Sequence, residues 1–258
     1  MPDFLAKLID DANRRVRAGY YDVEESAEHE PISLKRVIKS AENNAIIAEI
    51  KPISPAVGPL RPDIDPIEAA MKLVKGGAVA LSVLTEPDNF GGSLENLRRI
   101  RPHVSVPLLM KDIIIHQAQI HAAKKTGADC VLLIESALSR HLTDALHAMI
   151  HEAHEYQLEV LLEVHDENEL ERALKSEADI VGVNNRNLAT LETDLNTTTR
   201  LMAKANQRAG KVLISESGFE TANDIRKVKP AIVDGFLIGS SIMLSKDLEK
   251  KVREFVLA

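Results

Sequence analysis

Polar side chains close several short apolar runs of the sequence. The runs are AIIAEIK, PLLMK, EVLLE, IVGVN and KVLISES. Their polar residues are Glu49, Lys51, Lys111, Glu163, Asn184, Glu216 and Ser217. Lysine and glutamate exchange protons near neutral pH when burial and neighbouring charges shift their pKa values. This set therefore predicts an acid–base catalytic site.

The pair Glu49 and Lys51 shows how such residues meet. They are two positions apart, and residues two apart in a strand point to the same side. We expect a partly desolvated lysine near a second lysine to have a lowered pKa, and a glutamate in an apolar rim to have a raised pKa. The alternative is an ion-pair plug that only closes the fold. Buried ion pairs add little net stability compared with apolar packing, so the catalytic interpretation is favoured.

A second set of residues is typical of phosphate binding. Gly218 follows the run KVLISES, and Gly239, Ser240 and Ser241 follow GFLI. Barrels bind phosphate at such loops, through the backbone N–H groups that glycine leaves uncovered and through a short helix N-terminus. Ser54, after the first run, is expected to add a hydroxyl from across the site. The alternative is that these are ordinary turn glycines.

The elements that position these residues repeat one pattern from residue 45 onward. Apolar runs alternate with stretches of helical periodicity, and the runs are AIIAEIK, VALSVLT, LLMK, CVLLIE, EVLLEVH, IVGVN, KVLISES and GFLIGS. Eight such units predict a (β/α)8 TIM barrel whose chemistry lies at the strand C-termini. An open doubly wound sheet is the alternative, but KPISPAVG is not the Gly-rich dinucleotide turn of such sheets.

The N-terminal segment is predicted to add a helical extension to the barrel. Leu5, Leu8, Ile9, Ala12 and Val16 recur at helical spacing, and we assign residues 1–44 to this extension. Neither a linker nor a shift of composition divides the chain. We therefore expect a single barrel domain over residues 1–258.

Composition narrows the classes of function. A chain of 258 residues with 45% hydrophobic content can bury a large core. The formal charge of −7 argues against nucleic acid or an anionic membrane as partner. No apolar run approaches the roughly 20 residues of a spanning helix, and the N-terminus lacks a secretory signal. We expect a cytoplasmic protein with a small-molecule ligand, and the sequence indicates no partner subunit.

Other reactive residue types are given structural interpretations. Cys130 lies in the apolar run ADCVLLI and is interpreted as a small buried hydrophobe. His147, His151 and His154 share a helical face, but they lack the HExxH pair, and no metal site is predicted. His165 is expected to point to the opposite face of its strand from the preceding glutamate, with a supporting or structural role.

Several segments together resemble the indole-3-glycerol-phosphate synthases of tryptophan biosynthesis. They are IIAEIK, SVLTEPDNFGGSLENLRRIR, PLLMKDIIIHQAQIHAAKKTGADCVLLI, LLEVHDENELERAL, ISESGF and GFLIGSSIM, all within residues 45–245. The resemblance implies ring closure, decarboxylation and dehydration of 1-(2-carboxyphenylamino)-1-deoxyribulose 5-phosphate. Two lysines and a glutamate cover the proton transfers of this reaction without a metal or organic cofactor.

The resemblance also implies roles for individual residues. Lys111 is expected to be the general acid, Lys51 a second active-site lysine and Glu163 the general base. The residues expected to shape the site are Glu49, Asn184, Arg186, Glu216 and Ser217. Those expected to bind phosphate are Ser54, Gly218, Gly239 and Ser240. One departure concerns the loop after Lys51, where Pro52 and Ile53 stand in place of the family's usual basic residue.

Two other functions compete with this interpretation. One is another phosphate-binding barrel, such as phosphoribosylanthranilate isomerase, whose reaction needs one acid and one base and does not explain two lysines. The other is a non-catalytic barrel that serves as a scaffold. A scaffold has no reason to keep charges at Lys51, Lys111 and Glu163.

Overall fold

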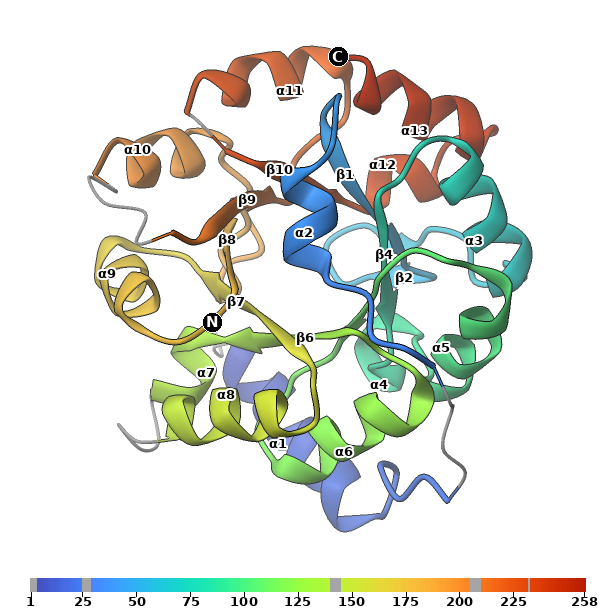
Figure 1. Ribbon diagram of the computed structural model, residues 1–258, viewed down its shortest axis with the longest axis vertical. Coiled ribbons are helices and arrows are strands. Elements are labelled where there is room, and N and C mark those ends of the chain that lie inside the picture. The colour runs from blue at the N-terminus through green and yellow to red at the C-terminus, as the bar shows by residue number, and fades with distance from the viewer. Residues whose placement is uncertain (1–3, 25–28, 140–144, 205–209, 232) are drawn as a thin grey trace.

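The strands form a closed barrel. The computed structural model describes residues 4–24, 29–139, 145–204, 210–231 and 233–258. Within these ranges eight parallel strands form a ring in which β1 pairs with both β4 and β10 (Figure 1). In order around the ring, the strands are β1 (Ala45–Ile50), β4 (Ala80–Leu84), β5 (Leu108–Lys111), β6 (Cys130–Ile134), β7 (Glu159–Val164), β8 (Ile180–Asn184), β9 (Val212–Glu216) and β10 (Gly235–Ile238). The predicted TIM barrel is confirmed, and the open sheet is wrong because the ring closes.

Helices surround the barrel on the outside (Figure 1). The longer ones that follow the strands are α3 (Pro66–Lys75), α5 (Leu94–Ile100), α6 (Gln117–Thr126), α8 (Ala145–Glu155), α9 (Glu167–Lys175), α10 (Asn196–Lys204), α11 (Ala222–Val228) and α13 (Leu248–Val256). Short elements in the loops are the β2 (Ile53–Ser54) and β3 (Gly58–Pro59) hairpin, α4 (Pro87–Phe90), α7 (Glu135–Ser139), α12 (Ser240–Met243), η1 (Arg101–His103) and η2 (Lys229–Ala231).

Side-chain caps fix the limits of several of these helices. Asp65 caps α3, which begins with Pro66, and Asp166 caps α9 by accepting from the backbone N–H of Glu169. Helix α6 ends at Gly127, in the left-handed conformation with φ +88°. A Cβ there would lie 2.8 Å from the Arg101 side chain, so glycine is required for both reasons.

Alternate residues of each strand face two different apolar layers. In β1, Ile46, Ala48 and Ile50 belong to the layer between strands and helices, whereas Ala45 and Ile47 belong to the barrel interior. In five strands, the last of the residues that point into the barrel is polar and lies at the carboxyl end of the strand. These residues are Glu49, Lys111, Glu163, Asn184 and Glu216. The alternation of the strand thus carries the polar group into the mouth of the barrel.

Two N-terminal helices lie at opposite ends of the barrel. Helix α1 (Phe4–Arg17) brings Phe4 and Leu8 to the cavity at the carboxyl ends of the strands, as expected for the N-terminal extension. Helix α2 (Leu34–Lys39) lies across the other end, in front in Figure 1. The segment before α2 is held there by Glu159 at the start of β7, which accepts from the Ser33 hydroxyl at 2.5 Å.

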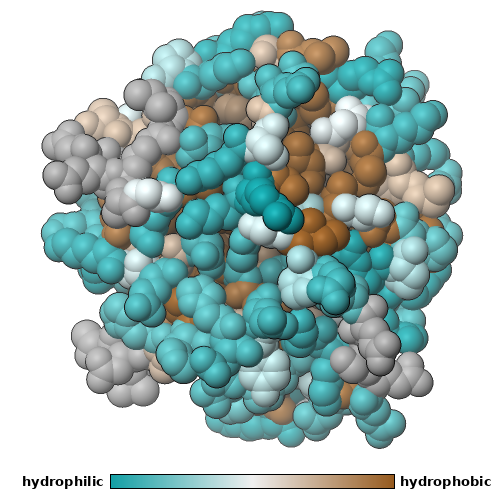
Figure 2. All heavy atoms as spheres, viewed as in Figure 1, coloured by the Kyte–Doolittle hydropathy of each residue, from teal (hydrophilic) through white to brown (hydrophobic). Residues whose placement is uncertain are grey.

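The face that carries α2 is mainly hydrophilic, with hydrophobic side chains gathered to the right of centre in Figure 2. The helices in the described ranges include none that is long and apolar enough to cross a membrane. The buried apolar residues form two clusters, one inside the barrel and one between its strands and helices.

Candidate active site

A cavity of about 820 Å³ opens at the carboxyl ends of the strands. It is lined by the strand ends, by α1 and by the β2–β3 hairpin. All the residues predicted for the site line this one cavity. They are Glu49, Lys51, Ser54, Lys111, Glu163, Asn184, Arg186, Glu216, Ser217, Gly218, Gly239 and Ser240. The sequence therefore identified positions that the fold brings together from six different strands and their loops.

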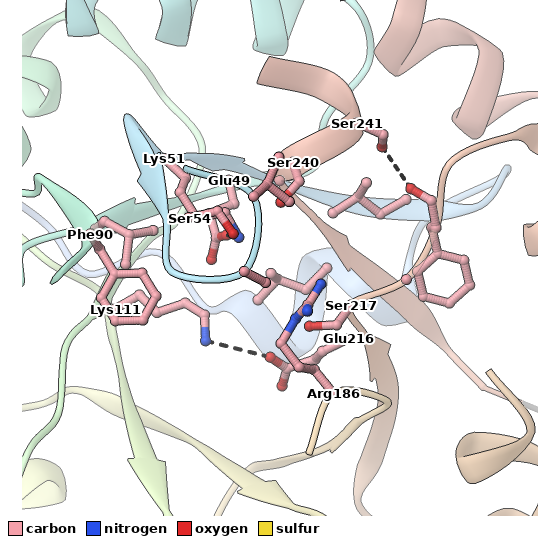
Figure 3. A pocket seen from close by; sticks show the side chains of 18 of the residues that line it. Glu49, Lys51, Ser54, Phe90, Lys111, Arg186, Glu216, Ser217, Ser240 and Ser241 are labelled. Carbon is pink, nitrogen blue, oxygen red and sulfur yellow. Dashed lines mark hydrogen bonds and ion pairs between the residues drawn. The ribbon is translucent and has the colours of Figure 1, made fainter. Parts of the chain in front are cut away.

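Lys111 lies at the centre of the charged group. Its Nζ atom is 3.3 Å from Glu163 Oε2 and 3.7 Å from Glu216 Oε2, and Figure 3 shows it reaching toward Glu216. Burial alone would lower the pKa of Lys111, but the charges of Glu163, Glu216 and Glu49 outweigh it and raise the pKa well above its usual range. The expected lowering is thus wrong, because carboxylates surround this ammonium group.

The two carboxyl groups next to Lys111 differ in the direction of their pKa shifts. Burial would raise the pKa of both. At Glu163 the cations Lys111 and His165 outweigh burial, and the pKa falls well below its usual range. At Glu216 burial prevails over Lys111, and the negative charges of Glu163 and Glu49 add to it, so that the pKa rises to about 8. The two carboxyls beside Lys111 are therefore biased in opposite directions, Glu163 toward its ionised form and Glu216 toward its protonated form.

A second ion pair lies on the β1 side of the cavity. Lys51 Nζ is 2.7 Å from Glu49 Oε1, and the Ser82 hydroxyl donates to Glu49 Oε2 at 3.4 Å. Figure 3 shows Glu49, Lys51, Ser54 and Ser240 grouped together, apart from Lys111. The two lysines thus have separate carboxylate partners.

Two glycines make room for these carboxylates, and the sequence did not single out the first. A Cβ on Gly182 in β8 would lie 1.9 Å from Glu216 Oε1. A Cβ on Gly239 would lie 2.4 Å from Glu49 Oε1. Gly239 was predicted from its phosphate-binding pattern alone, yet its lack of a side chain also seats Glu49. The spacing of residues in the sequence gives no sign of such a contact across the barrel.

Glycine- and serine-rich loops form the other end of the cavity. After β9 the chain turns through Ser217 and Gly218, both left-handed with φ +65° and φ +89°. Such a backbone is strained for serine, and strained residues cluster at functional sites. The Ser241 hydroxyl donates to the Phe219 carbonyl at 2.6 Å and ties α12 to this loop. Gly239 and Ser240 stand at the start of α12, beside the same end of the cavity.

An apolar wall lines another part of the cavity. Its members are Phe4, Leu8, Phe90, Ile113, Leu132, Ile134 and Leu188. A wall of this kind accepts a flat aromatic ring. The helical periodicity of the N-terminus revealed Leu8, but not that this helix reaches the cavity.

Arg186 is held by the loop after β8. Its backbone N–H donates to Asn184 Oδ1 at 2.9 Å, and its Nη1 donates to the Leu191 carbonyl at 2.7 Å. Burial lowers the pKa of this guanidinium, which still carries its charge at any physiological pH. The side chain thus presents a cation to the cavity in a fixed orientation.

A buried network that the sequence did not suggest joins α1 to the strand ends. Arg15 Nη1 lies 2.7 Å from Glu86 Oε1, and Arg15 Nη2 lies 3.7 Å from Asp112 Oδ1. The Thr85 hydroxyl donates to Asp112 Oδ2 at 2.7 Å. Because Asp112 directly follows Lys111, this network fixes the end of β5.

The histidines fall into two groups. His151 and His154 lie near separate acids, at 3.9 Å from Glu155 and 3.0 Å from Asp179. His165 was expected to face away from Glu163, and this is wrong. Its Nε2 lies 3.3 Å from Glu163 Oε1, because residues two apart at a strand end share one side.

The chain is similar to known proteins over most of its length. A family model described as Indole-3-glycerol phosphate synthase matches residues 5–255. A protein of that name from Polaromonas naphthalenivorans (strain CJ2) is 44% identical over 199 residues, which cover 77% of this chain and 74% of the relative. One from Acinetobacter baumannii (strain ATCC 17978) is 46% identical over 199 residues, with 77% and 72% covered. One from Haloarcula marismortui is 43% identical over 216 residues, with 83% and 78% covered.

A solved structure shares the fold at low sequence identity. The thiamine phosphate pyrophosphorylase from Pyrococcus furiosus superposes with a TM-score of 0.60 and 16% identity, over 86% of this chain and 96% of the other. At this identity the likeness concerns the fold alone.

Proposed function

The chain belongs to the indole-3-glycerol phosphate synthase family, and from this premise we propose how its residues perform the reaction. The enzyme closes the indole ring of 1-(2-carboxyphenylamino)-1-deoxyribulose 5-phosphate with loss of carbon dioxide and water, as a carboxy-lyase. The observation that carries the assignment of roles is the position of Lys111 Nζ, 3.3 Å from Glu163 and 3.7 Å from Glu216, with the pKa lowered at the first carboxyl and raised at the second.

The first step needs a proton donor. The aromatic carbon that bears the carboxylate attacks the ketone, and the carbonyl oxygen develops negative charge. Lys111, kept protonated by its carboxylate neighbours, is proposed to donate a proton to that oxygen. Loss of carbon dioxide then returns the bonding electrons to the ring.

The later dehydration needs a base and an acid. The new hydroxyl leaves as water once it is protonated, and a proton is removed to complete the indole. Glu163 is proposed as the base, and Glu216, 3.7 Å from Lys111, is proposed to support proton delivery. Lys51 is proposed as the second active-site lysine, and Glu49 holds it in place at 2.7 Å.

The remaining predicted residues are proposed to bind the two ends of the substrate. The phosphate is assigned to Gly218, Gly239, Ser240 and Ser54, at the end of the cavity where uncovered backbone N–H groups favour an anion. The aromatic ring is assigned to the apolar wall, with Asn184, Arg186 and Ser217 shaping the space between. The loop after Lys51 forms a hairpin through Ile53 and Ser54 without the basic residue usual in the family.

Family membership favours this reaction over an isomerase or a scaffold. We propose that the enzyme works in the cytoplasm, because a sugar phosphate of this kind carries charge and does not cross a membrane unaided.

The experiment is a direct assay of the purified chain with the synthetic substrate, without added metal. We expect indole fluorescence to appear together with one equivalent of carbon dioxide, at a rate that a chelator leaves unchanged. Isomerisation of a phosphoribosyl substrate without release of carbon dioxide would instead support the rival function. No turnover with either substrate would support the scaffold.

A further inference from the structure

His165 is the third member of a charge chain that starts at Lys111 and ends at Glu169. Glu163 lies between two cations, with Oε2 3.3 Å from Lys111 Nζ and Oε1 3.3 Å from His165 Nε2. On its other side, His165 Nδ1 lies 3.3 Å from Glu169 Oε2. With the imidazole protonated, the order along the chain is cation, anion, cation, anion.

Glu169 fixes the backbone and the ring of His165 together. The same Oε2 atom accepts the His165 backbone N–H at 2.6 Å, and the backbone N–H of Glu169 donates to Asp166 at the start of α9. The His165 side chain is 16% exposed, so only a narrow edge of it reaches solvent. The imidazole is thus held by the helix start rather than by the cavity wall.

The surroundings of His165 favour its positive form. Burial would lower the pKa of His165, but contacts with Glu163 and Glu169 outweigh it and raise the pKa to about 10. The exposed edge faces a second, smaller cavity whose charged members are Glu192, Asp194 and Arg200.

The position of His165 distinguishes the two carboxyls that share Lys111. Lys111 lies near both Glu163 and Glu216, so it favours ionisation of each. His165 makes its close contact with Glu163. The other groups facing this centre are Glu49 from β1, which opposes further negative charge, and the neutral Asn184 from β8.

We propose that His165 is a positioning residue that, as a fixed imidazolium, selects Glu163 rather than Glu216 as the ionised carboxylate and holds it beside Lys111. This inference rests on the proposed role of Glu163 as the base. It assigns to His165 a task distinct from contact with the substrate: it sets which of two neighbouring acids is free to accept a proton.

The test replaces His165 by glutamine, which keeps an N–H donor and removes the charge. Loss of a cation at this distance raises the pKa of Glu163 by roughly 1 to 3 units. Protonation of the base then occurs at higher pH, so activity is lost as the pH falls. We expect the acid limb of kcat/KM to lie at higher pH in His165→Gln than in the parent, by roughly 1 to 3 pH units.

The matched control is His154→Gln, which removes an imidazole paired with Asp179 at the far end of the barrel. This variant is expected to keep the parent pH profile. A profile of His165→Gln that is superimposable on the parent, or lower by a constant factor, would overturn the proposal, because a merely structural role changes the rate without moving a limb.

A measurement that needs no turnover separates this proposal from the proposed function. Imidazole nitrogen NMR of the parent should show both ring nitrogens of His165 protonated at pH 8, and Glu163→Gln should lower the pH at which the ring loses its proton. A neutral ring at pH 8 overturns the proposal whatever the activity. If the ring is charged but the parent forms no indole, the assigned reaction fails and the charge chain stands.

Discussion

The two ends of the barrel both contain buried acidic side chains, but the contacts of these side chains differ. At the start of β6, Asp129 accepts backbone N–H groups of Ile32 and Leu108 at 2.8 Å, and it also lies 2.7 Å from Arg101 Nη1. At the mouth, both carboxyl oxygens of Glu216 are buried and have no hydrogen-bond partner among the residues that the structure describes.

This difference indicates what each end is for. Every oxygen of Asp129 is used to join loops that are far apart in the sequence, so the acid stabilises the fold. The oxygens of Glu216 and one oxygen of Glu163 remain without hydrogen bonds, an arrangement that costs stability unless a substrate or a proton uses them. Barrels generally separate stability and catalysis between their two ends in this way.

The largest effect should come from removing the ammonium group at the mouth. Lys111→Ala is expected to lower kcat on the order of 10²-fold or more, because the general acid is lost. Its melting temperature should change little, since Glu216 is already biased toward its neutral form and Glu163 can take up a proton when the shared cation is absent. The assay is indole fluorescence, paired with a thermal melt.

Lys39→Ala is the control, because this exposed lysine lies on α2 at the other end. This variant should keep the kcat and the melting temperature of the parent. Near-normal turnover of Lys111→Ala with a much lower melting temperature would show that the charged cluster is a structural plug.

At the end of the barrel that contains Asp129, a substitution is expected to lower stability and leave kcat nearly unchanged. Asp129→Asn keeps the shape but turns an NH2 group toward donors that include the Arg101 guanidinium. Breaking a buried pair in this way should cost about 3 kcal/mol of unfolding free energy, which corresponds to a melting temperature lower by roughly 6–12 °C. Below that temperature kcat should stay within about twofold of the parent. A large loss of kcat in the folded variant would remove the proposed division between the two ends.

The sequence predicted the fold and the positions of the site because both follow from local periodicity. Alternation in β1 places Glu49 in line with the inward-facing Ala45 and Ile47, and the same rule holds for Lys111 and Glu216. The direction of the pKa shift at Lys111 could not be predicted, because it depends on carboxylates from β1, β7 and β9. The rule of alternation was available for His165 as well, and there it was misapplied.

Contacts across the barrel are the other part that the sequence did not reveal. Gly182 shows no special conformation and resembles any strand glycine, yet its missing side chain is the space that Glu216 occupies. The pair of Arg15 and Asp112 joins residues almost a hundred positions apart, and no periodicity relates them.

A matched pair of glycines tests the difference between the two ends of the barrel with smaller expected effects. Gly182→Ala places a Cβ 1.9 Å from Glu216 Oε1, and this flexible side chain can move aside. We expect kcat to fall on the order of 10-fold, because displacement of groups around the general acid misaligns the reaction, with little change in stability.

Gly235→Ala at the opposite end meets backbone instead, with the Ala45 carbonyl 3.0 Å away. It should lower the unfolding free energy by about 1–3 kcal/mol, because packed backbone cannot move aside, while kcat of the folded variant remains normal. Denaturant unfolding and steady-state assays of both variants provide the comparison. The proposed division between the two ends fails if Gly182→Ala lowers the unfolding free energy substantially and leaves kcat near that of the parent.

The smallest effect concerns the proton on Glu216. As the pH rises through about 8, Glu216 loses this proton, and a second full negative charge appears 3.7 Å from Lys111 Nζ. That charge raises the pKa of Lys111 further and makes the ammonium a weaker acid. The parent should therefore lose activity several-fold on the alkaline side of its kcat/KM profile.

Glu216→Gln cannot ionise, so its profile should lack this alkaline limb while its activity at pH 6.5 stays within several-fold of the parent. Lys111 itself is not the source of the limb in this account, because its surrounding carboxylates keep it protonated far above pH 8. If Glu216→Gln retains the limb unchanged, the titrating group is elsewhere. The missing hydrogen bonds of the Glu216 oxygens, among the residues that the structure describes, would then reflect packing beside Gly182 rather than a proton that the reaction uses.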